Sequence, residues 1–261
     1  MQISLQSSKK CLTADASAFY LIALATFLFC ASAHGSVPKP RGSSLQHLLQ
    51  KEIRNRPSNN FDSLLKKWES TYSTAAVQPL LSIAADRKLS DPDRYIAVMG
   101  AAKLGGTATA VPIIPLLKDP SWMIRNAALR ALTALRDPVT APAILPLLRD
   151  PALVVRVEAV TAVETLRPLG ATEALLETLQ NRANYHGGKA QWVPQHALQA
   201  LVKLRAKNVA PKLAPLLNYD SDSKFQHLTI NALETLTGEN RAPGRPLAEK
   251  VREWKRVLAK Q

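Results

Sequence analysis

Cysteine is nearly absent from this chain of 261 residues: Cys11 and Cys30 are the two, and both lie near the N-terminus. If that part is removed as a leader, neither disulfide bonds nor a cysteine nucleophile are available to the remaining chain. No Asn-x-Ser/Thr sequence occurs, so the sequence carries no sign of N-glycosylation. Aromatic residues make up 5% of the chain and no alternating strand pattern is present. Leu, Ala and Val in helical patterns are therefore left to build the core.

Motifs for catalysis or metal binding are missing as well. None of the five histidines is followed by glutamate, which excludes the His-Glu-x-x-His zinc pattern, and there is no glycine-rich phosphate loop. One set of residues could be imagined as a metal cluster, but it has no regular ligand spacing: His186, His196, Asp220, Asp222 and His227. We therefore expect no metal, no cofactor and no enzymatic activity.

What the chain does have is an internal repeat. The stretch from Pro115 to Arg125, Pro-Leu-Leu-Lys-Asp-Pro-Ser-Trp-Met-Ile-Arg, returns 31 residues later as Pro-Leu-Leu-Arg-Asp-Pro-Ala-Leu-Val-Val-Arg, from Pro146 to Arg156. The apolar residues that follow keep the spacing of one helical face, and five such units can be aligned. A fixed period of this length predicts stacked helices. We predict an all-α fold, an α-solenoid of helix-turn-helix repeats with helical caps.

Each unit is expected to contain two helices. The first has a Pro-Leu-Leu signature with an earlier proline, such as Pro112 before Pro115, and the second proline predicts a short or kinked helix. Asp119-Pro120 and Asp150-Pro151 then form the turn into the second helix, where a carboxylate can accept hydrogen bonds from exposed N–H groups.

The Asp-Pro turn and the arginine six residues after the Asp resemble the HEAT repeat family, in its short bacterial form of about 31 residues. The resemblance covers roughly residues 75–238, and in the family these residues build a ladder of contacts along the stack. The match is best at Asp119 and Asp150; Asp91 and Arg94 lie closer together, and Asp220 is followed six residues on by Gln226. The His-Glu pairs of iron-dependent HEAT-repeat hydroxylases are absent, and a likeness to phycobilin lyases concerns the fold alone.

The N-terminus is typical of an export signal. Lys9 and Lys10 precede an apolar run that ends at Phe29, and Ala31-Ser-Ala33 is a small-x-small cleavage pattern. We expect residues 1–33 to be a signal peptide, 34–45 a linker, 46–74 N-terminal capping helices, 75–238 the repeats and 239–261 a C-terminal capping helix. The protein would then be periplasmic or secreted, or membrane-anchored if the leader is not cleaved.

The formal net charge of +14 is concentrated at the two ends of the chain. Residues 34–57 carry +4 and residues 241–261 carry +5, whereas residues 58–240 carry only +4. The basic ends are either solvated caps or a contact for an anionic lipid or polysaccharide. Nucleic acid is disfavoured because the sequence shows no interleaving of basic and aromatic residues.

Two surfaces are candidates for binding a protein partner. The spacing between the third and fourth units is 38 residues, and the extra residues form a loop with aromatic and cationic side chains: Tyr185, His186, Lys189 and Trp192. Aligned positions of the second helices form a polar strip on the expected inner face: Tyr95, Asn126, Arg130, Gln195, Gln199, His227 and Asn231. Each surface has a plain alternative, a longer turn and an ordinary solvated helix face.

These observations favour an exported protein-interaction scaffold without enzymatic activity, with an unidentified protein as partner. Binding of an anionic envelope component through the basic ends is the second hypothesis, and a lyase-like enzyme is a distant third.

Overall fold

The structure is a computed structural model and describes residues 42–56 and 60–260. The chain divides into two units, Met1–Lys39 and Pro40–Gln261, and all described residues belong to the second. The expected signal peptide and most of the expected linker lie outside the described residues. The first described helix begins at Gly42, inside the expected linker 34–45, because Gly and Ser residues are readily accommodated at a helix N-terminus.

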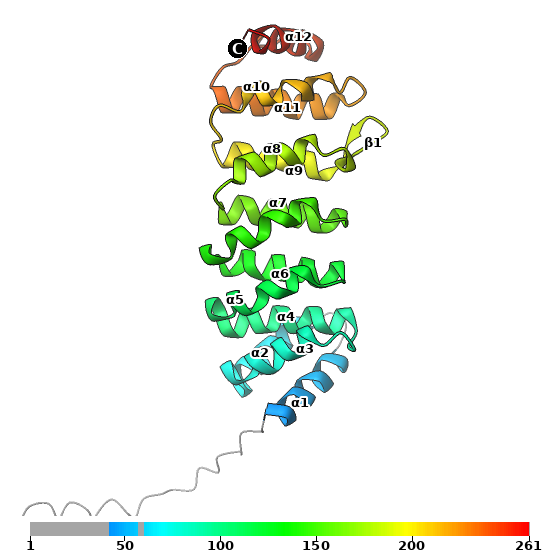
Figure 1. Cartoon of the computed structure of the whole chain (residues 1–261), viewed down its shortest axis with the longest axis vertical. Coiled ribbons are helices and arrows are strands. Elements are labelled where there is room, and N and C mark those ends of the chain that lie inside the picture. Colours follow the sequence, from blue (N-terminus) through cyan, green and yellow to red (C-terminus); the bar gives the residue numbers. More distant parts are fainter. Residues whose placement is uncertain (1–41, 57–59, 261) are drawn as a thin grey trace, which may run out of the picture. The chain divides into compact units, whose positions relative to one another are not determined.

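The described residues form paired helices in five successive repeats (Figure 1). The first helices of the repeats are α3 (Val77–Ala85), the run η2 (Gly106–Thr109), α5 (Ala110–Ile113) and η3 (Ile114–Lys118), then η4 (Pro138–Arg149), α8 (Ala171–Gln180), and the run α10 (Ala210–Leu213) and η6 (Ala214–Asn218). The second helices are α4 (Asp91–Gly105), α6 (Trp122–Leu135), α7 (Leu153–Leu166), α9 (Trp192–Lys203) and α11 (Ser223–Thr237).

Further elements stand before, between and after the repeats. They are α1 (Gly42–Arg54), α2 (Phe61–Thr71), η1 (Ser73–Ala76), η5 (Arg182–Asn184), β1 (Tyr185–His186), β2 (Lys189–Ala190) and α12 (Leu247–Leu258). The two strands form a minimal antiparallel hairpin in which Tyr185 pairs with Ala190 and His186 with Lys189. The prediction of an all-α solenoid is confirmed, with this hairpin as a small addition.

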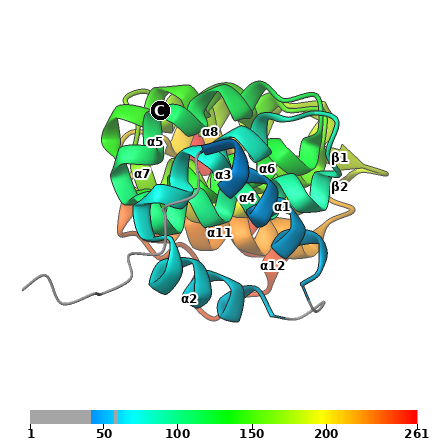
Figure 2. The same cartoon turned by 90° about the horizontal axis from the view of Figure 1, so that it is seen from below.

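The helices form two layers within the unit Pro40–Gln261 (Figures 1 and 2). Each second helix packs on the next, α4 on α6, α6 on α7, α7 on α9 and α9 on α11. Each first helix packs on the second helix of its own repeat, as α3 does on α4 and α8 on α9. Equivalent positions of the second helices consequently form rows that run across several repeats.

The prolines explain the irregular first helices. Pro142 and Pro146 lie inside η4, which is a 3₁₀ helix over its whole length, and the runs containing Pro112 and Pro211 change from α-helix to 3₁₀ helix partway along. Proline has no N–H to donate and its ring crowds the preceding turn, so it fits the first turn of a helix, as Pro79 does in α3, but interrupts a regular α-helix further along. The helices with two prolines are short or irregular, as predicted, whereas α8, which has no proline, is a continuous α-helix.

A ladder of arginines links successive repeats at the turn between the first and second helices. Arg125 donates from Nε and Nη2 to the two carboxylate oxygens of Asp150 in the next repeat, at 2.6 and 2.8 Å. Its Nη1 donates to the carbonyl oxygens of Asp119 and Pro120 in its own turn. Arg94 donates from Nη1 and Nη2 to the two carboxylate oxygens of Asp119, and its Nε donates to the carbonyl oxygen of Ala84 at 2.9 Å.

The carboxylates of the ladder also shape the turns. Asp119 accepts a hydrogen bond from the Ser121 amide at 2.9 Å, and Asp150 accepts one from the Ala152 amide at 2.8 Å. Burial alone would raise the pKa of the Asp119 carboxyl, but the hydrogen bonds from Arg94 and from the Ser121 amide hold it below its usual value. The ladder therefore depends on ionised aspartates.

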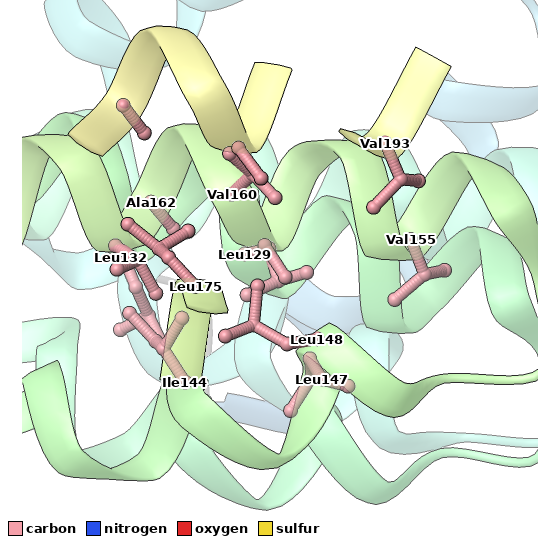
Figure 3. Close-up of a cluster of buried hydrophobic side chains, with 14 of the residues drawn as sticks. Leu129, Leu132, Ile144, Leu147, Leu148, Val155, Val160, Ala162, Leu175 and Val193 are labelled. Atoms are coloured by element: carbon pink, nitrogen blue, oxygen red, sulfur yellow. The ribbon is translucent and has the colours of Figure 1, made fainter. Parts of the chain in front are cut away.

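The core runs continuously between the layers and includes both caps. Figure 3 shows its centre, where side chains of α6, η4, α7 and α8 meet and Leu132 is fully buried. The caps contribute one buried tryptophan each, Trp68 from α2 and Trp254 from α12. Trp68 lies so close to Gly100 of α4 that a Cβ atom on Gly100 would come within 2.6 Å of its ring. Glycine is thus required there by close approach.

One run of the described residues, Asp91–Lys118, is long and apolar enough to cross a membrane by length and composition alone. It comprises α4, η2, α5 and η3, and its backbone turns at Gly106, where φ is 54°. Ala97, Val98 and Ala101 of this run are fully buried between neighbouring helices. The run is part of the core of the stack.

Candidate binding surface

The polar positions predicted on the second helices lie on one face of their layer, although α7 contributes none of them. Arg130, Gln199, His227 and Asn231 are exposed, while Tyr95, Asn126 and Gln195 are half-buried. Because α4, α6, α9 and α11 belong to one layer with α7, these side chains lie on the same face of that layer. We call these seven residues the second-helix strip. Most of them carry amide, hydroxyl or imidazole groups that can hydrogen-bond a partner with little electrostatic cost.

A groove opens between α9 and α11 within this strip. It has a volume of about 230 Å³, and the surface that lines it is mostly apolar. Leu198 and Ala232 are buried in its floor, and Val202 and Leu228 are half-buried. Gln199, Lys203, Asn231 and Thr235 complete the lining. The groove thus combines apolar area with two amides of the strip.

Three exposed apolar side chains extend the strip, and sequence reasoning missed two of them. Trp122, Val154 and Trp192 are 47%, 44% and 66% exposed, at the N-terminal ends of α6, α7 and α9. Trp122 lies one helical turn before Asn126, which places both on one face. The available signal was a bulky apolar residue directly after the Asp-Pro turn, a position that faces away from the core.

The inserted loop is only partly available to a partner, because the half-buried Tyr185 packs within the chain. The ring of Tyr185 stacks on Tyr219 at 4.7 Å between ring centroids and meets the edge of Phe225. Its hydroxyl donates to the carbonyl oxygen of Leu179 at 2.6 Å, and burial raises its pKa. Tyr185 is a packing residue of the fourth repeat. His186 and Lys189 at the hairpin tip are exposed.

The same insertion replaces a rung of the arginine ladder. Arg156 donates from Nε to the side-chain oxygen of Asn184 at 2.8 Å, so that Asn184 takes the place of the aspartate. Pro194 stands where the next arginine would be, and Asp222 instead accepts from the backbone amide of Ala190 at 2.9 Å. The hairpin is therefore a structural link between the fourth and fifth repeats as well as a projection.

The pKa of one carboxyl group beside the second-helix strip is shifted. Glu158 of α7 is half-buried, and this burial raises its pKa, while the positive charge of Arg130 on α6 opposes the shift.

Within the described residues, no three His, Cys, Asp or Glu side chains lie together as a metal site would require. Asp222 accepts hydrogen bonds from the backbone amides of Phe225 and Gln226 at the start of α11. Asp220 accepts one from the side-chain amide of Gln226.

The basic C-terminal helix offers fewer free charges than its sequence indicated. Arg256 pairs with Glu253 at 2.7 Å, and Lys250 pairs with Glu234 of α11 at 3.3 Å. Because these acids neutralise part of the positive charge, α12 behaves largely as an ordinary capping helix, with Val251, Trp254 and Leu258 buried.

The two layers of paired helices, linked by equivalent turns, define an α-solenoid. Residues 77–164 match the profile of HEAT repeats, so this part of the chain is a HEAT-repeat array. The match spans α3 to the last turns of α7, which includes the two complete rungs of the ladder. HEAT repeats are typical of proteins that hold other proteins.

Two further comparisons complete this result. Among solved structures, this chain is similar to a chain in the structure of the complex of CpcE and CpcF of phycocyanin lyase from Nostoc sp. PCC7120. The sequence identity is 18%, and the similarity covers 87% of this chain and 98% of that chain. The TM-score is 0.31, which supports no inference about what this chain does. The comparison with curated proteins finds no match.

Proposed function

We propose that this protein is an exported, non-enzymatic scaffold that binds a partner protein on the second-helix strip. The observation that carries the proposal is the exposure of Trp122 and Trp192 on the same face as the strip. Large aromatic side chains at the centre of an interface supply most of its binding energy. The amides of Asn126, Gln195 and Gln199 beside them can then fix the orientation of the partner.

The supporting test compares two matched variants. A Trp122→Ala/Trp192→Ala double variant removes the exposed anchors, and Val111→Ala removes an apolar side chain that is 58% exposed in the other layer. Both variants and the wild type are used to capture partners from an envelope extract, and the captured molecules are quantified by mass spectrometry. We expect one protein to bind the wild type and Val111→Ala, and to be at least tenfold depleted on the double variant.

The outcome also separates the proposal from the second hypothesis. Equal capture by all three proteins would show that the second-helix strip is not the binding surface. Capture of lipid or polysaccharide that is lost when Arg252 and Lys260 of the C-terminus are replaced by Glu would favour attachment to the envelope. Such attachment must weaken steeply with added salt, whereas contacts made by tryptophans and amides should not.

Export is tested independently. If the leader is cleaved after Ala33, the exported protein begins at His34, and N-terminal sequencing of protein from the extracytoplasmic fraction detects this directly. A membrane-bound form with Met1 intact would contradict cleavage and support an anchor.

A further inference from the structure

The backbone has a positive φ just after each of the five second helices of the described residues. The residues are Gly106 (φ 54°), Arg136 (54°), Arg167 (49°), Arg205 (54°) and Gly238 (74°). Glycine adopts this conformation freely, but a side chain there brings Cβ against the backbone. Glycine is accordingly the usual residue after a helix. The outer two repeats follow that rule, and the three inner repeats have arginine instead.

These arginines have no structural task that would explain them. All three are exposed. Within the part of the chain that the structure describes, the side chains of Arg136 and Arg205 have no hydrogen bond or ion pair, and the side chain of Arg167 reaches only the carbonyl oxygen of Lys203, at 3.5 Å. The ladder arginines, in contrast, are held by the aspartates of the turns. A strained backbone conformation that no contact within the chain explains indicates a contact with another molecule.

The three arginines form a row on one edge of the stack. They lie in the loops that connect one repeat to the next, on the edge opposite the β1–β2 hairpin (Figure 1). Since packed helices lie about 10 Å apart, successive arginines follow at about that spacing. The acids beside them are already engaged: Asp137 accepts from the Val139 amide, and Glu164 pairs with Lys203 at 2.8 Å.

Two apolar side chains accompany this row. Val139 is 69% exposed and Leu169 is 99% exposed, each two or three residues after an arginine of the row. No aromatic residue is present in these loops, 136–139, 167–170 and 205–208. A surface for single-stranded nucleic acid would use aromatic stacking platforms, and a polysaccharide would gain little from exposed Leu and Val. Cationic and apolar side chains together match an acidic peptide that also carries apolar residues.

We propose that Arg136, Arg167 and Arg205, with Val139 and Leu169, bind an extended acidic segment of a partner protein. A chain in the extended polyproline II conformation has three residues per turn and advances about 3.1 Å per residue, so carboxylates three residues apart lie on one face and meet successive arginines. Each guanidinium can hold a carboxylate through two parallel hydrogen bonds. Apolar side chains between the acids cover Val139 and Leu169. This inference goes beyond the proposed function, because it uses another surface and stands even if Trp122 and Trp192 prove dispensable.

The test uses the full chain and a labelled 15-residue synthetic peptide with Glu at every third position and Leu and Ser between. The main variant, Arg136→Gly/Arg167→Gly/Arg205→Gly, removes the row and relieves the backbone. The control variant, Lys118→Ser/Arg149→Ser/Arg182→Ser, removes three exposed cations from the opposite edge. Fluorescence anisotropy at two salt concentrations measures binding, and thermal unfolding measures stability.

We expect the main variant to lose at least tenfold in affinity for the peptide while its melting temperature stays the same or rises. The control variant should bind within twofold of the wild type, and Val139→Ser/Leu169→Ser should bind several-fold more weakly than the wild type. Equal losses in both triple variants would show unspecific attraction of charge, and a lower melting temperature in the main variant would show that the arginines are structural. Either result overturns the proposal. Tighter binding of single-stranded DNA or of phosphatidylglycerol vesicles through the same arginines would overturn it too.

Discussion

Arg125 and Asp150 join consecutive repeats through two parallel hydrogen bonds of 2.6 and 2.8 Å, with side chains that are 12% and 4% exposed. Both groups are charged and largely buried, so each compensates the charge of the other. Removing one member of such a pair leaves an uncompensated buried charge, which is more damaging than losing the attraction itself. The ladder therefore fixes how one repeat docks on the next, in addition to the apolar core.

The replacement Asp150→Ala should lower the free energy of unfolding by about 3–5 kcal/mol, because it strands the Arg125 guanidinium. Asp150→Asn should cost clearly less, since Asn184 performs the same task for Arg156 in the next rung. Urea denaturation of both variants measures the difference. If Asp150→Asn is as unstable as Asp150→Ala, the charge of the rung matters and its hydrogen-bond geometry does not.

Stability should fall in acid through Asp119. Its pKa is depressed in the folded protein, so the folded state binds this proton less readily than the unfolded chain does. The contribution is complete above the usual value of 3.8 and is lost as the pH falls through the lower, folded value. Urea denaturation at pH 7 and at about pH 3 should show a flatter pH dependence for Asp119→Asn than for the wild type.

Leu132 tests the repeat register in the core. It is fully buried in α6, and Leu132→Ala should lower the free energy of unfolding by about 2–5 kcal/mol through lost burial and the cavity left behind. Leu169→Ala is the matched control, because Leu169 is 99% exposed and its truncation should change stability by less than about 0.5 kcal/mol. Thermal unfolding measures both, and an unchanged curve for Leu132→Ala would contradict the register.

The repeat explains why the fold could be predicted and parts of the surface could not. Spacing in the sequence determines which residues of α6 and α7 face the core, so Leu132 and its equivalents follow from the pattern alone. The family resemblance implied a ladder, but the partner of each arginine was harder to assign, because Arg94 lies near Asp91 in sequence, yet binds Asp119 of the next repeat more fully. The spacing within one repeat does not show which residue of the next repeat an arginine binds.

The inserted loop shows the same limit for the candidate site. Sequence analysis grouped Tyr185 with Trp192 because both are aromatic and close in the chain. Their environments differ because Tyr219 and Phe225, from the following repeat, pack on Tyr185 and nothing equivalent covers Trp192. The exposed Trp122 was missed because its match in the repeat is the apolar Leu153, so the repeat pattern did not set it apart.

The contrast between Tyr185 and Trp192 gives the last prediction. Tyr185→Ala should lower the free energy of unfolding by about 3 kcal/mol, because it removes the stacked ring, and Tyr185→Phe by about 1 kcal/mol, because the Leu179 carbonyl loses its donor. Trp192→Ala, in contrast, should leave stability within about 0.5 kcal/mol of the wild type and should weaken partner capture. Thermal unfolding and capture from an envelope extract are measured in parallel on the three variants. Tyr185→Phe keeps the ring in place, so a loss of capture in this variant without a loss of stability would mean that the Tyr185 hydroxyl belongs to the binding surface after all.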